Sequence, residues 1–145
     1  MRISTLLLCL CVSVSSVAQT TIKWADLEDV DFVEFYDRER SEWSLKAEFS
    51  EEILALDNQE VIITGYVIPL DVSGEVYVLS AFAFSSCFFC GGAGPETVMG
   101  LTFTDTPPQL KTDDVISVRG TLQVNVNPGL EFHYMLTDVV ITKLF

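Results

Sequence analysis

VISVRGTLQVNV, at residues 115–126, carries the clearest structural signal in the chain. Apolar residues or glycine occupy every second position from Ile116 to Val126, and polar residues occupy the positions between them. A period of two is typical of a β-strand with one buried face and one hydrated face. The pattern therefore predicts a half-buried strand with Gly120 near its centre.

A second stretch repeats this arrangement. Val61, Ile63, Gly65 and Val67 alternate as residues 116–122 do, with the glycine again at the third apolar position. Glycine weakens a strand unless the strand bends sharply or another backbone approaches it closely. Two such strands favour a mainly β fold, a small five-stranded OB-like barrel whose first and fourth strands curl across both halves. A β-sandwich, the alternative, normally has about seven strands. Five strands are expected, at residues 60–70, 75–84, 97–104, 115–126 and 132–142.

Length and charge limit the possible functions. The chain has 145 residues, of which 49% are hydrophobic and 20% charged, and this composition is typical of one folded domain. Its 21 acidic and 8 basic residues give a formal net charge of -13. Nucleic-acid binding needs a basic surface, so this charge argues against a nucleic-acid partner. The single histidine excludes a metal site with several histidine ligands.

Residues 1–18 have the pattern of a secretory signal peptide. Arg2 precedes the apolar run at residues 6–12, and Ser16 and Ala18 supply small residues for cleavage before Gln19. The run is shorter than the roughly 20 apolar residues that a spanning helix needs, so we expect no membrane anchor. A periplasmic or secreted location follows, where disulfide bonds can persist.

Residues 19–58 form an acidic segment, which we expect to be a helical arm packed on the barrel domain at residues 59–145. The spacing of Trp24 and Leu27 predicts a short amphipathic helix at residues 22–30. Ser50 suits the cap of a second helix, because two acidic residues follow it at the positive end of that helix. Aromatic side chains between these helices are expected to pack on the barrel; they are Phe32, Phe35, Tyr36 and Trp43.

The loop at residues 85–96 joins the second and third expected strands and contains Cys87 and Cys90. This Cys-x-x-Cys pair allows four interpretations. A structural disulfide would enclose few residues and add little stability. Two thiolates can bind zinc or a softer ion such as Cu(I). Thiol–disulfide catalysis is disfavoured, because the glycines and proline after Cys90 cannot continue the helix that lowers a catalytic thiol pKa. The fourth interpretation is a pair of reduced, buried thiols.

A metal ion at Cys87 and Cys90 needs further ligands, since two thiolates make half of a tetrahedral site. Glu96 and His133 are the candidates in this chain, and another molecule is the alternative source. The structural alternatives are a loop-end hydrogen-bond acceptor for Glu96 and an ordinary strand histidine for His133. Zinc is the metal we expect, and no organic cofactor is expected because phosphate-loop and dinucleotide motifs are absent.

Several of these stretches together resemble domain-of-unknown-function family 3299, a group of small exported bacterial proteins. The resemblance is carried by Trp24-x-x-Leu27, Val118-x-Gly120-x-Leu122 and, most specifically, Gly65-Tyr66-Val67-x-Pro69-Leu70 with the cysteine loop. That loop looks like a Bacteroidetes-type version. The resemblance implies an OB-like fold, brings no established activity, and links some members to metal-uptake transport genes. Many relatives have a Cys-x-His loop, which implies metal ligation because histidine cannot form a disulfide.

We therefore expect an exported, non-enzymatic binding domain that binds a metal ion through the Cys87 and Cys90 loop, with a metal-transport system as an implied partner. The alternative is a protein-interaction module in which Phe88 and Phe89 form the anchor and the cysteines form a structural disulfide. A thiol–disulfide oxidoreductase is the third hypothesis, and it requires a strongly lowered thiol pKa.

Overall fold

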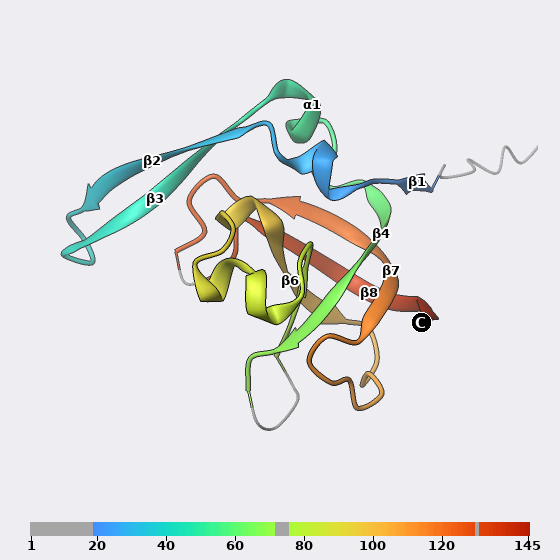
Figure 1. The fold of residues 1–145 in the computed structure, drawn as a ribbon. Helices are drawn as coiled ribbons and strands as arrows, with labels where there is room; N and C mark the ends of the chain where they lie inside the picture. Colours follow the sequence, from blue (N-terminus) through green and yellow to red (C-terminus); the bar gives the residue numbers. More distant parts are fainter. Residues whose placement is uncertain (1–18, 72–75, 130) are drawn as a thin grey trace, which may run out of the picture.

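Five strands of the computed structural model, which describes residues 19–71, 76–129 and 131–145, form a closed barrel (Figure 1). The order around the barrel is β4-β5-β6-β8-β7, and pairing between β4 and β7 closes it. β6 and β8 run parallel, whereas the other neighbours are antiparallel. The predicted OB-like barrel and its five strands are therefore confirmed. The strands are β4 (Glu60–Pro69), β5 (Tyr77–Ser80), β6 (Val98–Phe103), β7 (Val115–Val124) and β8 (Tyr134–Leu144).

Gly65 and Gly120 lie where the barrel strands change partner or register. The first part of β4 pairs with β7 and its last part pairs with β5, and Gly65 directly precedes the change. In β7, the register with β8 shifts around Gly120. A Cβ atom would lie 2.6 Å from the Ser80 carbonyl oxygen at Gly65, and 2.6 Å from that of Thr137 at Gly120. A neighbouring backbone therefore requires glycine at both positions, as the sequence predicts.

Alternating apolar side chains fill the barrel interior. β7 buries Ile116, Val118 and Leu122, and the side chains between them are half-buried. Tyr134 of β8 is fully buried, and its hydroxyl donates a hydrogen bond of 2.8 Å to the carbonyl oxygen of Leu27. This buried hydrogen bond attaches the preceding segment to the barrel core.

The segment that precedes the barrel contains more strand than helix, so the prediction of a helical arm is wrong. After β1 (Thr20–Thr21), the 3-10 turn η1 (Trp24–Leu27) occupies the place of the first expected helix. β2 (Val30–Asp37) and β3 (Glu42–Phe49) form an antiparallel hairpin that extends away from the barrel (Figure 1). The Asp37 carboxylate accepts hydrogen bonds from the backbone N–H groups two and three residues later, at 2.8 and 3.2 Å. This side-chain turn closes the hairpin.

The second expected helix is present as α1 (Glu51–Leu54), a single turn. Ser50 caps it as predicted, because the Ser50 Oγ accepts a hydrogen bond of 3.4 Å from the N–H of Ile53. Ile53 is fully buried in the core, so this turn anchors the end of the hairpin to the barrel.

The predicted signal peptide at residues 1–18 lies outside the described residues. The first described element is β1, which pairs in parallel with β4 through residues 20 and 21. In the described part of the chain, no helix is long and apolar enough to cross a membrane.

Candidate functional site

The cysteine loop between β5 and β6 folds into three 3-10 turns, η2 (Phe84–Ser86), η3 (Phe88–Cys90) and η4 (Pro95–Thr97). Gly91 ends η3 with a φ of 71°, a left-handed conformation that glycine adopts without steric cost. Figure 1 shows this yellow segment as a compact layer in front of the barrel rather than an extended loop.

Cys87 is a packing residue of this loop. It is fully buried in a small apolar cluster with Ile68 of β4, Val78 of β5 and Val98 of β6. Alternate side chains of these strands fill the barrel interior, so this cluster lies on the outer face of the sheet. Two partly buried aromatic side chains pack against it, Phe88 from the loop and Phe132 from the segment before β8. The loop is therefore fixed to the barrel wall through Cys87.

The two cysteines are free thiols that approach the same acceptor. The Sγ atoms of Cys87 and Cys90 lie 3.1 and 3.0 Å from the carbonyl oxygen of Phe84. The disulfide, which was the alternative to metal ligation, is not formed in this structure, and Cys90 is exposed. Loss of hydration within the loop, followed by the neighbouring Cys87 thiol, raises the pKa of Cys90. A catalytic thiol needs a lowered pKa, so this environment opposes thiol–disulfide catalysis.

His133 is held in a structural environment. Its Nδ1 atom lies 3.0 Å from the carbonyl oxygen of Asn125, and its ring packs against Phe32 with ring centroids 4.9 Å apart. Burial lowers the pKa of His133 below its ordinary value of 6.5. The neutral ring therefore serves as a link between the hairpin and the barrel, which matches the structural interpretation of this residue.

Glu96 packs within its own turn of the loop. It lies in η4, and its carboxylate folds back against Gly94. Burial and then the nearby Glu96 charge raise the pKa of Tyr134. In the part of the chain that the structure describes, no three His, Cys, Asp or Glu side chains form a group that could hold a metal ion. The predicted ligands Cys87, Cys90, Glu96 and His133 are therefore not assembled into one site.

A cleft of about 320 Å³ separates the hairpin from the cysteine loop, and we call it the hairpin–loop cleft. Trp43 and Leu45 of β3 form one wall, and Phe88 and Pro95 of the loop form the other. The Trp43 side chain is 72% exposed. Its only aromatic neighbour in the described residues is Tyr36, at 5.7 Å between ring centroids. The predicted packing of these two side chains on the barrel is therefore wrong.

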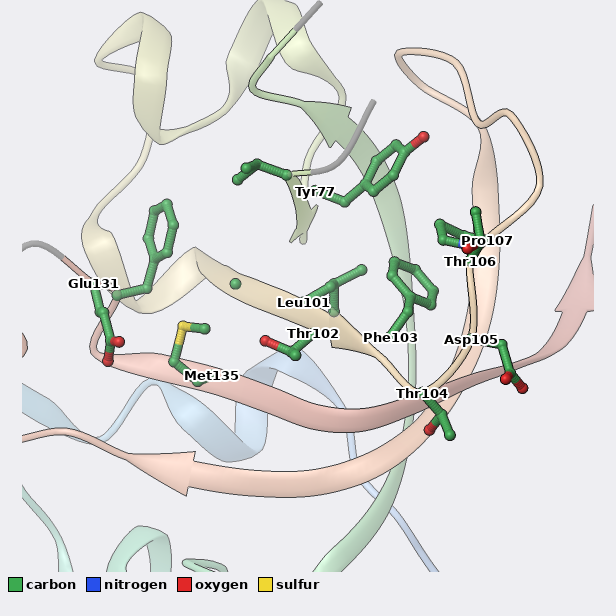
Figure 2. Close-up of a pocket in the computed structure, with 13 residues that line it drawn as sticks. Tyr77, Leu101, Thr102, Phe103, Thr104, Asp105, Thr106, Pro107, Glu131 and Met135 are labelled. Carbon is green, nitrogen blue, oxygen red and sulfur yellow. The ribbon is translucent and has the colours of Figure 1, made fainter. Parts of the chain in front are cut away.

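A second and larger opening of about 680 Å³ lies over β6, and we call it the β6 cavity. It is lined by Gly100 and Leu101 of β6 and by Phe132 and Met135. Figure 2 shows Leu101 and Met135 among its lining side chains. Glu131 and Phe132 line both the β6 cavity and the hairpin–loop cleft, so the two openings are neighbours.

Sequence reasoning missed both openings, because each depends on segments distant along the chain. The hairpin–loop cleft depends on the hairpin, and the sequence pattern predicts a helical arm in its place. Asp37, placed between two runs that contain alternating apolar residues, is the signal that could have revealed its turn. For the β6 cavity, Gly100 inside an apolar strand was the available signal of a close approach.

Neither a known protein family nor a curated protein matches this sequence. The structure is similar to the crystal structure of a DUF3299 family protein from Pseudomonas aeruginosa PAO1, with a TM-score of 0.54. The match covers 88% of this chain and 95% of that chain, at 16% sequence identity. The chain has the fold of a DUF3299 family protein. The resemblance carried by the Gly65 motif and the cysteine loop is therefore confirmed at the level of the fold, and a shared fold assigns no ligand.

Proposed function

We propose that this chain is an exported, non-enzymatic protein-binding domain whose contact surface is the hairpin–loop cleft. The observation that carries the proposal is the exposure of Trp43, 72% of whose side chain faces solvent at the wall of the cleft. An indole ring is a large apolar group, and its burial against a partner contributes more than that of most side chains. The fold does not need this exposed ring, whereas a binding surface does.

The surroundings of Trp43 support the same proposal. Tyr36 lies directly opposite Trp43 on the same face of the hairpin and is 49% exposed, and Phe89 on the loop is 40% exposed. Phe89 packs edge-to-face on Phe132, with ring centroids 6.2 Å apart, so its position at the surface is supported by the barrel segment before β8. Grouped exposed apolar side chains of this kind mark interaction sites more often than scattered ones. Phe88, the other expected anchor, is partly buried and shapes the wall of the cleft.

The candidate nucleophile and base in this region favour binding over catalysis. The raised pKa of the exposed Cys90 thiol keeps it protonated at neutral pH. The His133 ring is buried, and its Nδ1 already contacts the Asn125 carbonyl oxygen. The export part of the proposal rests on the sequence of residues 1–18 alone.

The test is partner capture by the exported chain with matched variants. The full chain is expressed with its leader in a didermal host, cross-linked in the native compartment and purified with its bound partner. Trp43→Ala should reduce capture at least about tenfold, because loss of an interface hot spot costs about 2 kcal/mol or more. Trp43→Phe should retain part of the capture.

The matched control is Leu144→Ala, because Leu144 is 56% exposed at the far end of β8. This variant should capture the partner as the wild type does. Equal capture by Trp43→Ala and Leu144→Ala would overturn the proposal, since the cleft would then contribute no more than any exposed apolar side chain.

A soft metal ion at Cys87 and Cys90 is a second candidate function, and the convergence of their sulfur atoms on one carbonyl oxygen favours it. The remaining ligands would come from a partner molecule, because the described residues do not assemble a third. The test is metal analysis and thiol counting on freshly exported protein, with Cys90→Ser as the variant and Ser85→Ala as the control. Wild-type protein without metal would remove this candidate.

A further inference from the structure

The β6 cavity has an apolar floor and acidic ends. Figure 2 shows Glu131 beside Met135 at one end of β6, and Asp105 at the other end, where the chain leaves the strand. Thr102 lies between them on the same strand. Two carboxylates are thus separated by a surface of side chains that carry no charge.

Gly100 keeps the floor of this cavity low. A Cβ atom at this position would collide with the Met135 Sδ atom and would lie 3.0 Å from the Phe132 Cδ2 atom. Because Gly100 has no side chain, Met135 and Phe132 rest directly on the backbone of β6. They form an apolar surface against which an aliphatic stem can pack.

The charge of the cavity has one sign. Asp105 and Glu131 are its acidic lining residues, and no Lys or Arg side chain lines this cavity. At the hairpin–loop cleft the Arg40 guanidinium packs on Gly129, and it pairs with Asp37 and Glu42. Neither Asp105 nor Glu131 forms an ion pair within the described ranges 19–71, 76–129 and 131–145. The formal charge of -13 strengthens the attraction of this surface for cations.

The two openings together make an elongated site. Glu131 and Phe132 line both of them, so one carboxylate and one aromatic ring stand between a cavity of about 680 Å³ and a cleft of about 320 Å³. A Lys or Arg side chain placed there would meet the Glu131 carboxylate with its head and the Phe132 ring and Met135 with its stem. A chain that continues in both directions fits this arrangement better than a single compact ligand.

We propose that the β6 cavity binds an extended basic segment of the partner protein, with a Lys or Arg side chain seated between Glu131, Phe132 and Met135. This inference rests on the proposed function and names the chemistry of the partner. The acidic lining opposes phosphate, so a nucleic acid does not fit. The described residues around Asp105 and Glu131 do not form a group that could hold a metal ion.

The test uses the full chain, labelled with 13C at the methionine methyl groups, and a capped octapeptide of alternating lysine and leucine as the probe. Met135 lines the cavity, whereas Met99 is fully buried in the core and serves as an internal reference. The Met135 methyl signal should shift on titration, and the Met99 signal should stay in place. A matched peptide of alternating glutamate and leucine should leave both signals unchanged.

The decisive variant is Glu131→Lys, which should weaken lysine-peptide binding about tenfold, because it removes an attraction and adds a repulsion. Glu28→Lys changes the net charge equally at an exposed position outside both openings, and it should weaken binding less than about twofold. Both side chains are exposed, so both variants should fold.

Several outcomes would overturn the inference. If Glu131→Lys and Glu28→Lys weakened peptide binding equally, the binding would depend on the net charge of the molecule and not on the β6 cavity. If spermine shifted the Met135 methyl signal as much as the lysine peptide does, the cavity would be a site for small polycations. If only maltohexaose shifted this signal, the cavity would be a site for an oligosaccharide. The inference can also fail while the proposed function holds. That is the outcome if Trp43→Ala abolishes partner capture but the lysine peptide does not shift the Met135 methyl signal.

Discussion

The barrel and the hairpin use apolar side chains in opposite ways. In the barrel, Val61, Ile63 and Val118 are buried, and closure of β4 on β7 leaves these strands without an open edge between them. In the hairpin, Tyr36 and Trp43 lie opposite each other on one face and are exposed to solvent. The apolar residues of the barrel are accounted for by folding, because each removes surface from water. Folding does not account for the exposed apolar residues of the hairpin. This difference between the two regions identifies the hairpin as the surface that a partner would cover.

The largest expected effect is at the barrel glycines. Gly120→Ala should lower the free energy of unfolding by about 3 kcal/mol, because its Cβ atom would meet the Thr137 carbonyl oxygen at 2.6 Å and the Leu136 Cγ atom at 2.8 Å. Urea denaturation followed by tryptophan fluorescence measures it. Gly91→Ala is the control, since nothing lies within 4 Å of its Cβ position and only the positive φ costs about 1 kcal/mol. Equal effects at both glycines would contradict the barrel geometry.

A second comparison is within the cysteine pair. Cys87→Ser should cost about 1 to 2 kcal/mol, because it places a hydroxyl in the apolar cluster that joins the loop to the barrel. Cys90→Ser should cost less than about 0.5 kcal/mol, because Cys90 is exposed. Denaturation midpoints under reducing conditions measure both. If the two variants lost equal stability, the loop would not be held through Cys87.

The junction of hairpin and barrel should respond to pH through His133. Burial lowers its pKa in the folded state, whereas the unfolded chain takes up a proton near pH 6.5. The neutral ring therefore stabilises the fold above that pH, and this contribution is lost as the pH falls below about 6.5. His133→Gln should show a shallower fall in stability between pH 7 and pH 5. The chain has no other histidine that would titrate in this range. If wild type and His133→Gln lost stability with the same slope against pH, the prediction would be refuted.

An effect on stability as small as that of Cys90→Ser is expected at Trp43. Trp43→Ala should change the free energy of unfolding by less than about 0.5 kcal/mol, because the side chain is 72% exposed. The same variant should lose partner capture, so folding and binding separate at this residue. A loss of stability comparable to that of Gly120→Ala would mean that the hairpin serves the fold, and the contrast between the two regions would disappear.

The barrel could be predicted because its signals are local. Alternation along each strand and the central glycines Gly65 and Gly120 report which positions meet a neighbouring backbone, and both are visible in the sequence. The hairpin could not be predicted in this way. The spacing of Trp24 and Leu27 suggested a helix, yet those residues form one 3-10 turn, and the pairing of β2 with β3 depends on the Asp37 turn.

In the candidate site, too, the local features could be predicted from the sequence and the long-range ones could not. Cys87 and Cys90 converge because only two residues separate them, and sequence spacing is enough to show it. Glu96 and His133 do not join them, because their directions are set by contacts with Gly94 and with Phe32 and Asn125. The positions of Trp43 and Glu131 at the openings depend in turn on the hairpin and on the register of β8, which no local pattern reports.

The parallel pairing of β1 with β4 has a consequence for how such molecules can diversify. Residues 20 and 21 pair with Val61 and Ile62, and Ile22 donates to the Ile62 carbonyl oxygen at 2.9 Å. The segment between β1 and β4 therefore begins beside β4 and ends at Glu60, where β4 starts. Its two ends are neighbours, so the intervening residues behave as an insert with a fixed attachment point. Leu27 and Ile53 of this insert are buried in the core, so the exchangeable part is the hairpin between them. A hairpin of different length would alter the recognition element while these two anchors and barrel closure stay in place.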